Sequence, residues 1–137
     1  MRTKVIAGNW KMNKTPAEAA EFIMELKESV KGIENEIIAA VPFVCIPAAL
    51  TASEGSNIKI AAQNMHWEEK GAYTGEVSAQ MLKSINVEYV IIGHSERRQY
   101  YNETDETVNL KTLKALENGL IPIVCVGETL TEREQGV

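Results

Sequence analysis

The sequence contains little cysteine, no long apolar run and no basic segment, and each of these shortages excludes a class of protein. Cys45 and Cys125 lie far apart and outside any CxxC pair, which excludes a disulfide-stapled secreted scaffold. The longest apolar stretch, residues 37–50, is broken by Pro42 and Pro47 and is too short to span a bilayer. Lys and Arg number 14 against 19 Asp and Glu, a net charge of −5. We therefore expect neither nucleic acid nor an anionic membrane as the main partner.

The N-terminus also lacks the long apolar region of a signal peptide. We therefore expect a cytoplasmic protein in which both thiols are reduced and buried. With 137 residues, 45% of them hydrophobic and 24% charged, the chain has the composition of a globular protein rather than a disordered one. Its length favours about one domain.

Five short apolar runs, rich in β-branched residues, recur along the chain. They are residues 4–7, 36–41, 58–62, 89–92 and 121–126. Most are nearly continuous rather than alternating, which predicts strands that are covered on both faces. Most of them start about 30 residues apart, which is the spacing that a strand–helix–strand unit requires.

Helix signals fill the gaps between these runs. Thr15-Pro16-Ala17-Glu18 has the form of a capping box with proline at the first helical position, and Gly32 closes the helix that follows. Further helices are expected at about 47–54, around 77–85 and from about Asp105 to Gly119, where acidic residues occupy the first turn. The side chains expected to face the core are Ala19, Phe22, Ile23, Leu26 and Val30 in the first helix, Val77, Met81, Leu82 and Ile85 in the third, and Leu113, Leu116 and Leu120 in the fourth.

The alternation of strands and helices indicates a parallel sheet with right-handed crossovers, for which two architectures compete. A doubly wound five-strand sheet fits the length. A closed eight-strand barrel needs about 250 residues, nearly twice this chain. Only residues 129–137 follow the last strand, too few for a full covering helix. We therefore expect the sequence to stop inside a unit.

Polar side chains stand at the carboxyl ends of four of the five expected strands, where parallel α/β folds place their chemistry. Lys11, beside Asn9, is either a solvated surface lysine or a cation that attracts an anionic substrate and stabilises charge on an oxygen. His94 follows Gly93 and is either satisfied by backbone groups or acts as an acid, base or electrophile. Glu96 either starts a helix and pairs with a neighbouring arginine or takes part in the site.

Several other kinds of chemistry have no support in the sequence. The two histidines and two cysteines show no metal-ligand spacing, and neither a nucleophile elbow nor a phosphate-binding glycine loop is present. We interpret His66 as structural and Glu128 as a helix-start carboxylate. Residues 68–75 form a long excursion that exposes Tyr73 and Thr74, and this is either a mobile surface loop or an arm for an interface.

Five motifs resemble those of the triosephosphate isomerase family in order and spacing, and the resemblance covers the whole chain. They are Ala7-Gly8-Asn9-Trp10-Lys11-Met12-Asn13, Ala62-Gln63-Asn64, Gly71-Ala72-Tyr73-Thr74-Gly75-Glu76, Ile92-Gly93-His94-Ser95-Glu96-Arg97-Arg98 and Cys125-Val126-Gly127-Glu128. The resemblance implies an α/β fold, the (β/α)8 TIM barrel, of which residues 1–137 supply strands 1–5 and the first four connections as the N-terminal portion of a single domain. It also implies a cytoplasmic, homodimeric isomerase of glycolysis and gluconeogenesis. Such an enzyme interconverts D-glyceraldehyde 3-phosphate and dihydroxyacetone phosphate through an enediolate, without metal or organic cofactor.

The same resemblance implies roles for individual side chains. Lys11 and Asn9 bind the substrate, and Lys11 also stabilises the enediolate oxygen. His94 polarises the carbonyl as a neutral imidazole, a role for which this family is itself a standard example, and it shuttles protons between the two substrate oxygens. Glu96 orients Lys11. The residues with an implied supporting or interface role are Ser95, Cys125, Tyr73 and Thr74, the last of which enters the neighbouring subunit's site.

Two parts that the family needs are expected to lie outside these residues. They are a glutamate base after the sixth strand and the backbone N–H groups after strands seven and eight that hold the phosphate. Because each contributes several powers of ten to the rate, residues 1–137 alone should be nearly inactive.

Three interpretations follow. The first is the N-terminal part of a longer isomerase. The second is a non-catalytic half-barrel that self-associates through its open strand edges. The third, a complete doubly wound binder of the flavodoxin or receiver type, is disfavoured because the first strand ends without a phosphate-binding Ser/Thr-Gly loop or an acidic pair.

Overall fold

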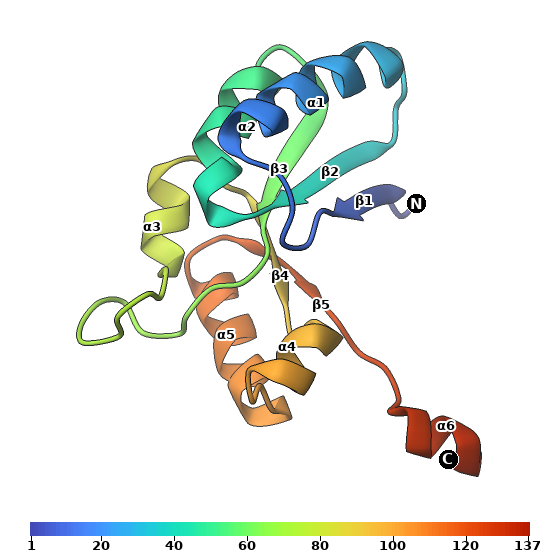
Figure 1. Ribbon diagram of the computed structural model, residues 1–137, viewed down its shortest axis with the longest axis vertical. Helices are drawn as coiled ribbons and strands as arrows, with labels where there is room; N and C mark the ends of the chain where they lie inside the picture. The colour runs from blue at the N-terminus through green and yellow to red at the C-terminus, as the bar shows by residue number, and fades with distance from the viewer.

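The computed structural model describes all residues, 1–137, and contains one sheet of five parallel strands (Figure 1). The strands are β1 (Val5–Asn9), β2 (Glu36–Val41), β3 (Ile58–Ala62), β4 (Tyr89–Ile92) and β5 (Ile121–Val124). Their order in the sheet is their order in the sequence, β1-β2-β3-β4-β5. A doubly wound sheet reverses its strand order at a switch point, and this sheet does not. The five strands form a half-barrel, as expected for the first part of a (β/α)8 barrel.

Helices lie between consecutive strands, and a last one follows β5. They are α1 (Pro16–Ser29), the 3-10 turn η1 (Phe43–Cys45) with α2 (Ile46–Ser53), α3 (Ala79–Ser84), α4 (Ser95–Tyr100), α5 (Asp105–Glu117) and α6 (Leu130–Gln135). Helix α6 is fully exposed and extends away from the sheet in Figure 1. None of the helices has the length and apolar character that a membrane-spanning segment requires.

Helix α1 begins where the sequence predicts it. The Thr15 hydroxyl accepts a hydrogen bond from the Glu18 N–H at 3.4 Å, and Pro16 lies in the first turn. Glu18 does not return a bond to the Thr15 N–H, so only half of the expected capping box forms. On the apolar stripe, Phe22 is 39% exposed, because its ring packs edge-on against the half-buried Trp10 rather than in the core. The fully buried members of the stripe are Ala19, Ile23 and Val30.

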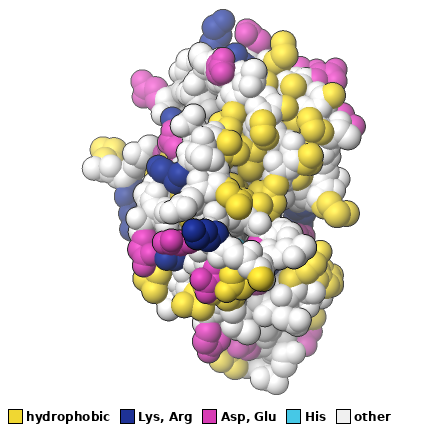
Figure 2. Space-filling model, turned by 90° about the vertical axis from the view of Figure 1, so that its left-hand side faces the viewer, with side chains coloured by type: hydrophobic (Ala, Val, Ile, Leu, Met, Phe, Trp, Pro, Cys, Tyr) yellow, Lys and Arg dark blue, Asp and Glu magenta, His cyan; other side chains and the backbone are white.

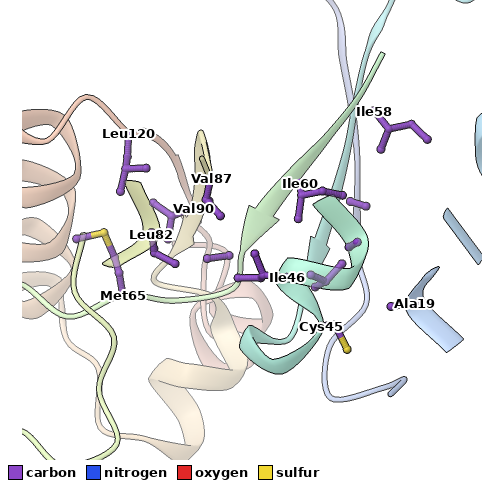
Figure 3. Close-up of a cluster of buried hydrophobic side chains, with 14 of the residues drawn as sticks. Ala19, Cys45, Ile46, Ile58, Ile60, Met65, Leu82, Val87, Val90 and Leu120 are labelled. Atoms are coloured by element: carbon purple, nitrogen blue, oxygen red, sulfur yellow. The ribbon is translucent and has the colours of Figure 1, made fainter. Parts of the chain in front are cut away.

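Two apolar clusters cover opposite faces of the sheet, because successive residues of a strand point to opposite sides. The larger cluster contains 21 buried residues from the helices and the strands, and Figure 3 shows its centre around Ile46, Ile60, Leu82 and Val90. The smaller cluster contains buried strand residues only, Ile38, Ala40, Ala61, Tyr89 and Ile91. The helices therefore stabilise one face, and the other is the concave face of the half-barrel.

The prediction that the strands are covered on both faces is right for the three central strands and wrong for the two outer ones. The residues of β2, β3 and β4 are buried or nearly so. In β1, Val5 and Ile6 are 49% and 57% exposed, and in β5, Ile121 and Val124 are 49% and 40% exposed. Because β1 and β5 are the edges of the sheet, each has a neighbouring strand on one side only. Their apolar side chains therefore remain open to solvent.

The prediction for the buried side of α5 is also wrong. Leu113 and Leu116 are 50% and 58% exposed, whereas Lys111 is 3% exposed. The helix is rotated so that the Lys111 ammonium reaches two polar partners beneath it. Two apolar residues, Val108 and Ala115, share the buried side with Lys111, and Leu120 beyond the helix is buried as expected.

Three smaller predictions about burial need correction. Leu82 in α3 is buried, but Met81 in α3 and Ile85 just after it are 52% and 38% exposed, because this helix has only six residues and presents one narrow side to the core. Both cysteines are free. Cys45 is buried as expected, but Cys125 is only partly buried, because it follows the edge strand β5.

Candidate active site

Residues from separate parts of the sequence meet at the carboxyl end of the sheet. Lys11 follows β1, and Glu96 lies in the first turn of α4, which follows β4. The Lys11 Nζ lies 2.7 Å from Glu96 Oε1, and His94 Nδ1 lies 3.6 Å from Glu96 Oε2. Glu96 therefore pairs with Lys11 and not with a neighbouring arginine. The three residues that the sequence predicts as catalytic lie together, and their roles stay predictions.

The backbone of Lys11 is left-handed, with a φ of 56°. This conformation costs a non-glycine residue about 1 kcal/mol or more, so neighbouring groups must hold it. The Asn9 Oδ1 accepts a hydrogen bond from the Lys11 N–H at 2.9 Å, and the Asn13 side chain donates to the Trp10 carbonyl at 2.8 Å. The turn after β1 is thus fixed on both sides of Lys11.

Gln63 lies in one of the motifs quoted above, but the sequence assigned it no role in the site. Its side-chain NH2 group donates to the carbonyl oxygens of Lys11 at 2.9 Å and Ala40 at 3.1 Å, and to Asn9 Oδ1 at 3.3 Å. A signal was present: Gln63 directly follows β3, and it continues the alternation of strand residues that face the concave side. Its amide joins the ends of β1 and β2 around the strained lysine.

His94 is the N-terminal cap of α4, and its Nδ1 accepts a hydrogen bond from the Glu96 N–H at 3.1 Å. A ring nitrogen that accepts carries no proton, so a neutral imidazole in this position carries its proton on Nε2. Gly93 makes the sharp turn before it with a φ of 73°. The Arg98 side chain donates to the Gly93 carbonyl at 2.9 Å and fixes that turn. His94 can therefore act as a hydrogen-bond donor through Nε2.

Charge keeps the Glu96 carboxylate ionised, and burial keeps the two thiols protonated. The hydrogen bond from Lys11, together with the charge of its ammonium, holds the pKa of Glu96 below its ordinary value. Burial raises the pKa of Cys125, an effect that the Arg98 charge partly opposes. Burial also raises the pKa of Cys45, whose thiol donates to the Lys14 carbonyl at 3.3 Å. Both cysteines are thus poor nucleophiles at neutral pH.

The segment that carries Tyr73 and Thr74 lies outside this cluster. It precedes α3 and projects from one side of the molecule in Figure 1. The His66 N–H donates to the Val77 carbonyl at 2.8 Å and closes the base of the excursion. His66 is 8% exposed, and its ring lies 4.7 Å from that of Tyr73, which is 43% exposed. This packing is consistent with a structural His66, and the interface role of Tyr73 and Thr74 stays a prediction.

The sequence also singled out Ser95 and Glu128, and both side chains are exposed. Ser95 begins α4, where it is exposed and its hydroxyl makes no hydrogen bond. Glu128 is exposed, precedes α6 and lies 3.7 Å from Arg133. No group of three or more His, Cys, Asp or Glu side chains lies close enough to hold a metal ion. The expectation that no metal or cofactor is needed stays a prediction.

The protein comparisons point to one family. The family model described as triosephosphate isomerase matches residues 4–137. A triosephosphate isomerase of Acetivibrio thermocellus is 65% identical over 138 residues, which cover 100% of this chain and 55% of that protein. One of Clostridium botulinum (strain Loch Maree / Type A3) is 61% identical, with coverage of 100% and 55%. The crystal structure of triosephosphate isomerase from Bartonella henselae matches with a TM-score of 0.92 and 40% identity, covering 98% of this chain and 56% of that one. The chain thus spans about half the length of these relatives.

Proposed function

The chain belongs to the triosephosphate isomerase family, and we propose that residues 1–137 supply the cation and the hydrogen-bond donor of an isomerase site. The reaction is the interconversion of D-glyceraldehyde 3-phosphate and dihydroxyacetone phosphate in glycolysis and gluconeogenesis. The observation that carries the proposal is the 2.7 Å contact between Lys11 Nζ and Glu96 Oε1 beside His94. Membership of a fold family alone does not fix function, whereas this contact joins two separate motifs in one site.

The chemistry that these side chains support is the formation of an enediolate. A base removes a proton from the carbon next to the carbonyl, negative charge develops on the carbonyl oxygen, and a proton returns to the neighbouring carbon. The Nε2–H of a neutral His94 donates to that oxygen and moves protons between the two substrate oxygens, while the Lys11 ammonium stabilises the negative charge. The proton-abstracting glutamate and the phosphate-binding N–H groups come from family elements beyond these residues.

The remaining residues of the site position Lys11 and His94. Glu96, a carboxylate whose pKa the Lys11 hydrogen bond lowers further, keeps the Lys11 ammonium at the mouth of the half-barrel. Asn9 holds the Lys11 N–H at 2.9 Å and contributes to substrate binding. Cys125, which follows β5, supports the site through packing against the smaller apolar cluster rather than through covalent chemistry. Ser95 supports it as the first residue of α4, between His94 and Glu96.

We also propose that the enzyme is a cytoplasmic homodimer in which Tyr73 and Thr74 reach the neighbouring subunit. Exposed large apolar side chains support this, since such side chains mark interfaces when they gather; they include Met12 at 94% and Val44 at 68% exposure. Figure 2 shows a broad area of hydrophobic side chains on one face of the molecule, beside the charged ones. The free thiols are consistent with a reducing compartment.

A second function has one observation in its favour. The exposed apolar residues of the edge strands β1 and β5 support a non-catalytic half-barrel that self-associates. Size-exclusion chromatography of the 137-residue polypeptide tests this. Concentration-dependent oligomers without isomerase activity favour the self-associating fragment, and a well-behaved monomer counts against it.

A chimera tests the isomerase proposal. Residues 1–137 replace the matching part of the Acetivibrio thermocellus enzyme, which supplies the rest of the barrel. We expect the chimera to convert glyceraldehyde 3-phosphate in a coupled assay, whereas the 137-residue polypeptide does so almost undetectably. His94→Gln should reduce kcat by about 10²- to 10⁴-fold, and Glu134→Gln on the exposed helix α6 should not. A folded chimera without activity, or one that tolerates His94→Gln, would contradict the proposal.

A further inference from the structure

A buried charged cluster lies behind the site, and the proposed chemistry does not use it. Lys111 in α5 is 3% exposed and Glu103, between α4 and α5, is 8% exposed. Such residues are almost never buried to this extent unless they are paired. The Lys111 ammonium donates to Glu103 Oε1 at 3.0 Å and to Asn64 Oδ1 at 2.8 Å. Arg97 in α4 donates to the other carboxylate oxygen of Glu103.

The buried cluster is linked to Lys11 through the segment after β3. Asn64, which is 6% exposed, accepts from Lys111 and directly follows Gln63 in the chain. Gln63 in turn donates to the Lys11 carbonyl at 2.9 Å. The segment after β3 therefore connects the buried ammonium to the strained backbone of Lys11. Asn64 contacts the ammonium, and Gln63 contacts the Lys11 carbonyl.

The buried cluster is also linked to Glu96 and His94, through Arg97 in α4. Helix α4 has six residues and none of them is buried, so neither its length nor an apolar face fixes its position. Its attachment is through side chains, and Arg97, which directly follows Glu96, is held by Glu103. Lys111 holds the same carboxylate from the opposite oxygen.

A buried ion pair of this kind needs an explanation beyond stability. Removing two charges from water is costly, and well-packed apolar residues in their place are often equally stable or more stable. Lys111 contacts both the segment that supports Lys11 and the segment that supports α4. A single apolar side chain cannot replace those two hydrogen bonds.

We propose that Lys111 is a positioning residue that sets the spacing between Lys11 and the start of α4, where Glu96 and His94 lie. This inference rests on the proposed function. Its expected signature is a loss in kcat with little change in KM, because small displacements of catalytic groups reduce the rate by up to about 100-fold.

The test uses Lys111→Met in the chimera described above. The substitution keeps a long apolar side chain and removes the ammonium. We expect kcat to fall by about 10- to 100-fold, with KM changed by less than about threefold. Lys114→Met is the matched control, since Lys114 lies in the same helix and pairs at 2.9 Å with the exposed Glu117. We expect it to leave kcat, KM and the melting temperature unchanged.

A double variant separates positioning from stability. Lys111→Met leaves the Glu103 carboxylate buried with Arg97 as its one charged partner, and this lowers the melting temperature. Adding Glu103→Gln removes the buried charge, so we expect the melting temperature to recover while kcat stays low. Recovery of both quantities together would show that Lys111 has a structural role only, and would overturn the inference.

A readout that does not depend on activity is the pair of imidazole ¹⁵N resonances of His94. Lys111→Met should shift the Nδ1 resonance, because α4 moves and the hydrogen bond from the Glu96 N–H changes, whereas Lys114→Met should not. If the parent chimera folds but is inactive, the proposed function fails, and the His94 resonances still decide this inference. Unshifted His94 resonances in a folded Lys111→Met variant would overturn it.

Discussion

Both ends of the parallel sheet contain left-handed backbone. The amino end places it on glycine and asparagine only, whereas the carboxyl end places it on lysine as well as on Gly93. The turns that lead into β2, β3, β4 and β5, at the amino end, use Gly32, Gly55, Asn86 and Gly119 at positive φ. The turn after β1, at the carboxyl end, uses Lys11 with a φ of 56° and Lys14 with a φ of 78°. Glycine and asparagine tolerate this conformation, whereas lysine is strained in it.

The polar pairs at the two ends of the sheet also differ in the kind of backbone that carries them. At the amino end, Lys59 lies 3.2 Å from Glu88 and Tyr89 donates to Glu36, and all four residues lie in or beside regular strands. At the carboxyl end, the Lys11–Glu96 contact depends on a strained turn and a short helix. Strain that the surroundings must hold in place is typical of functional sites. The proposed function therefore predicts that the amino end contributes to stability and the carboxyl end to chemistry, the division that barrels of this kind show.

The largest effect that this comparison predicts is on activity. In the chimera, Lys11→Met should lower kcat/KM by about 10³-fold, because it removes the charge that stabilises the enediolate. Lys59→Met, the matched change at the amino end, should leave kcat/KM within about twofold of the parent. Both variants should melt close to the parent temperature, since exposed ion pairs contribute little to stability. Steady-state kinetics and thermal melts measure this, and similar activity losses in both variants would refute the division of roles.

The second effect is on stability and sharpens the comparison. A Cβ at Gly93 would lie 2.8 Å from Val108 Cγ2 at a φ of 73°, whereas one at Gly55, with a φ of 74°, would have nothing within 4 Å. Gly93→Ala should therefore lower the free energy of unfolding by about 2–4 kcal/mol through strain and crowding. Gly55→Ala should lower it by about 1 kcal/mol through strain alone. Urea unfolding measures both, and equal losses would mean that the contact with Val108 relaxes freely.

The smallest effect concerns alkaline pH. Burial, the hydrogen bond to Glu36 and the charges of Glu36 and Glu88 raise the pKa of Tyr89 from 10.0 to about 12. Between these values the folded protein keeps a proton that the unfolded chain has lost, so stability falls as the pH rises through that window. Tyr89→Phe should cost about 1–2 kcal/mol at pH 7, reduce the loss between about pH 10 and 12, and leave kcat unchanged.

The control for this prediction is Tyr100→Phe, at a side chain that is 65% exposed. It should change neither the stability at pH 7 nor its alkaline dependence. Urea unfolding at several pH values compares the two variants, and an identical alkaline loss in Tyr89→Phe and the parent would contradict the role assigned to the buried hydroxyl.

The sequence predicted the central strands well because their apolar runs are buried on both sides, and 36–41, 58–62 and 89–92 match β2, β3 and β4 residue for residue. It also selected Lys11, His94 and Glu96, since each follows the end of a strand. It assigned no role to Gln63. That role depends on the three oxygen atoms to which the Gln63 side chain donates, and these belong to the distant residues Asn9, Lys11 and Ala40.

The error in the buried side of α5 has a physical cause that differs from edge position or helix length. An apolar stripe predicts that leucine is buried and lysine exposed, but Lys111 is buried because Glu103 and Asn64 satisfy its ammonium. Leu113 and Leu116 lie outside the side of α5 that Val108, Lys111 and Ala115 form, and they are exposed. Hydrogen bonds and ion pairs between residues far apart in the sequence help to determine which side of α5 is buried, and a local pattern of apolar residues does not contain this information.

The order of the strands also has a consequence for folding kinetics. Each strand pairs with the one just before it in the chain, so that Val5 faces Glu36 and Ile37 faces Ile58. The paired residues are 31 and 21 positions apart, so each pairing closes a loop of one βα unit and loses less chain entropy than a pairing between the first and last strands would. A chain that leaves the ribosome from its N-terminus can therefore add one βα unit at a time. At every stage of that growth the most recent strand is the template for the next.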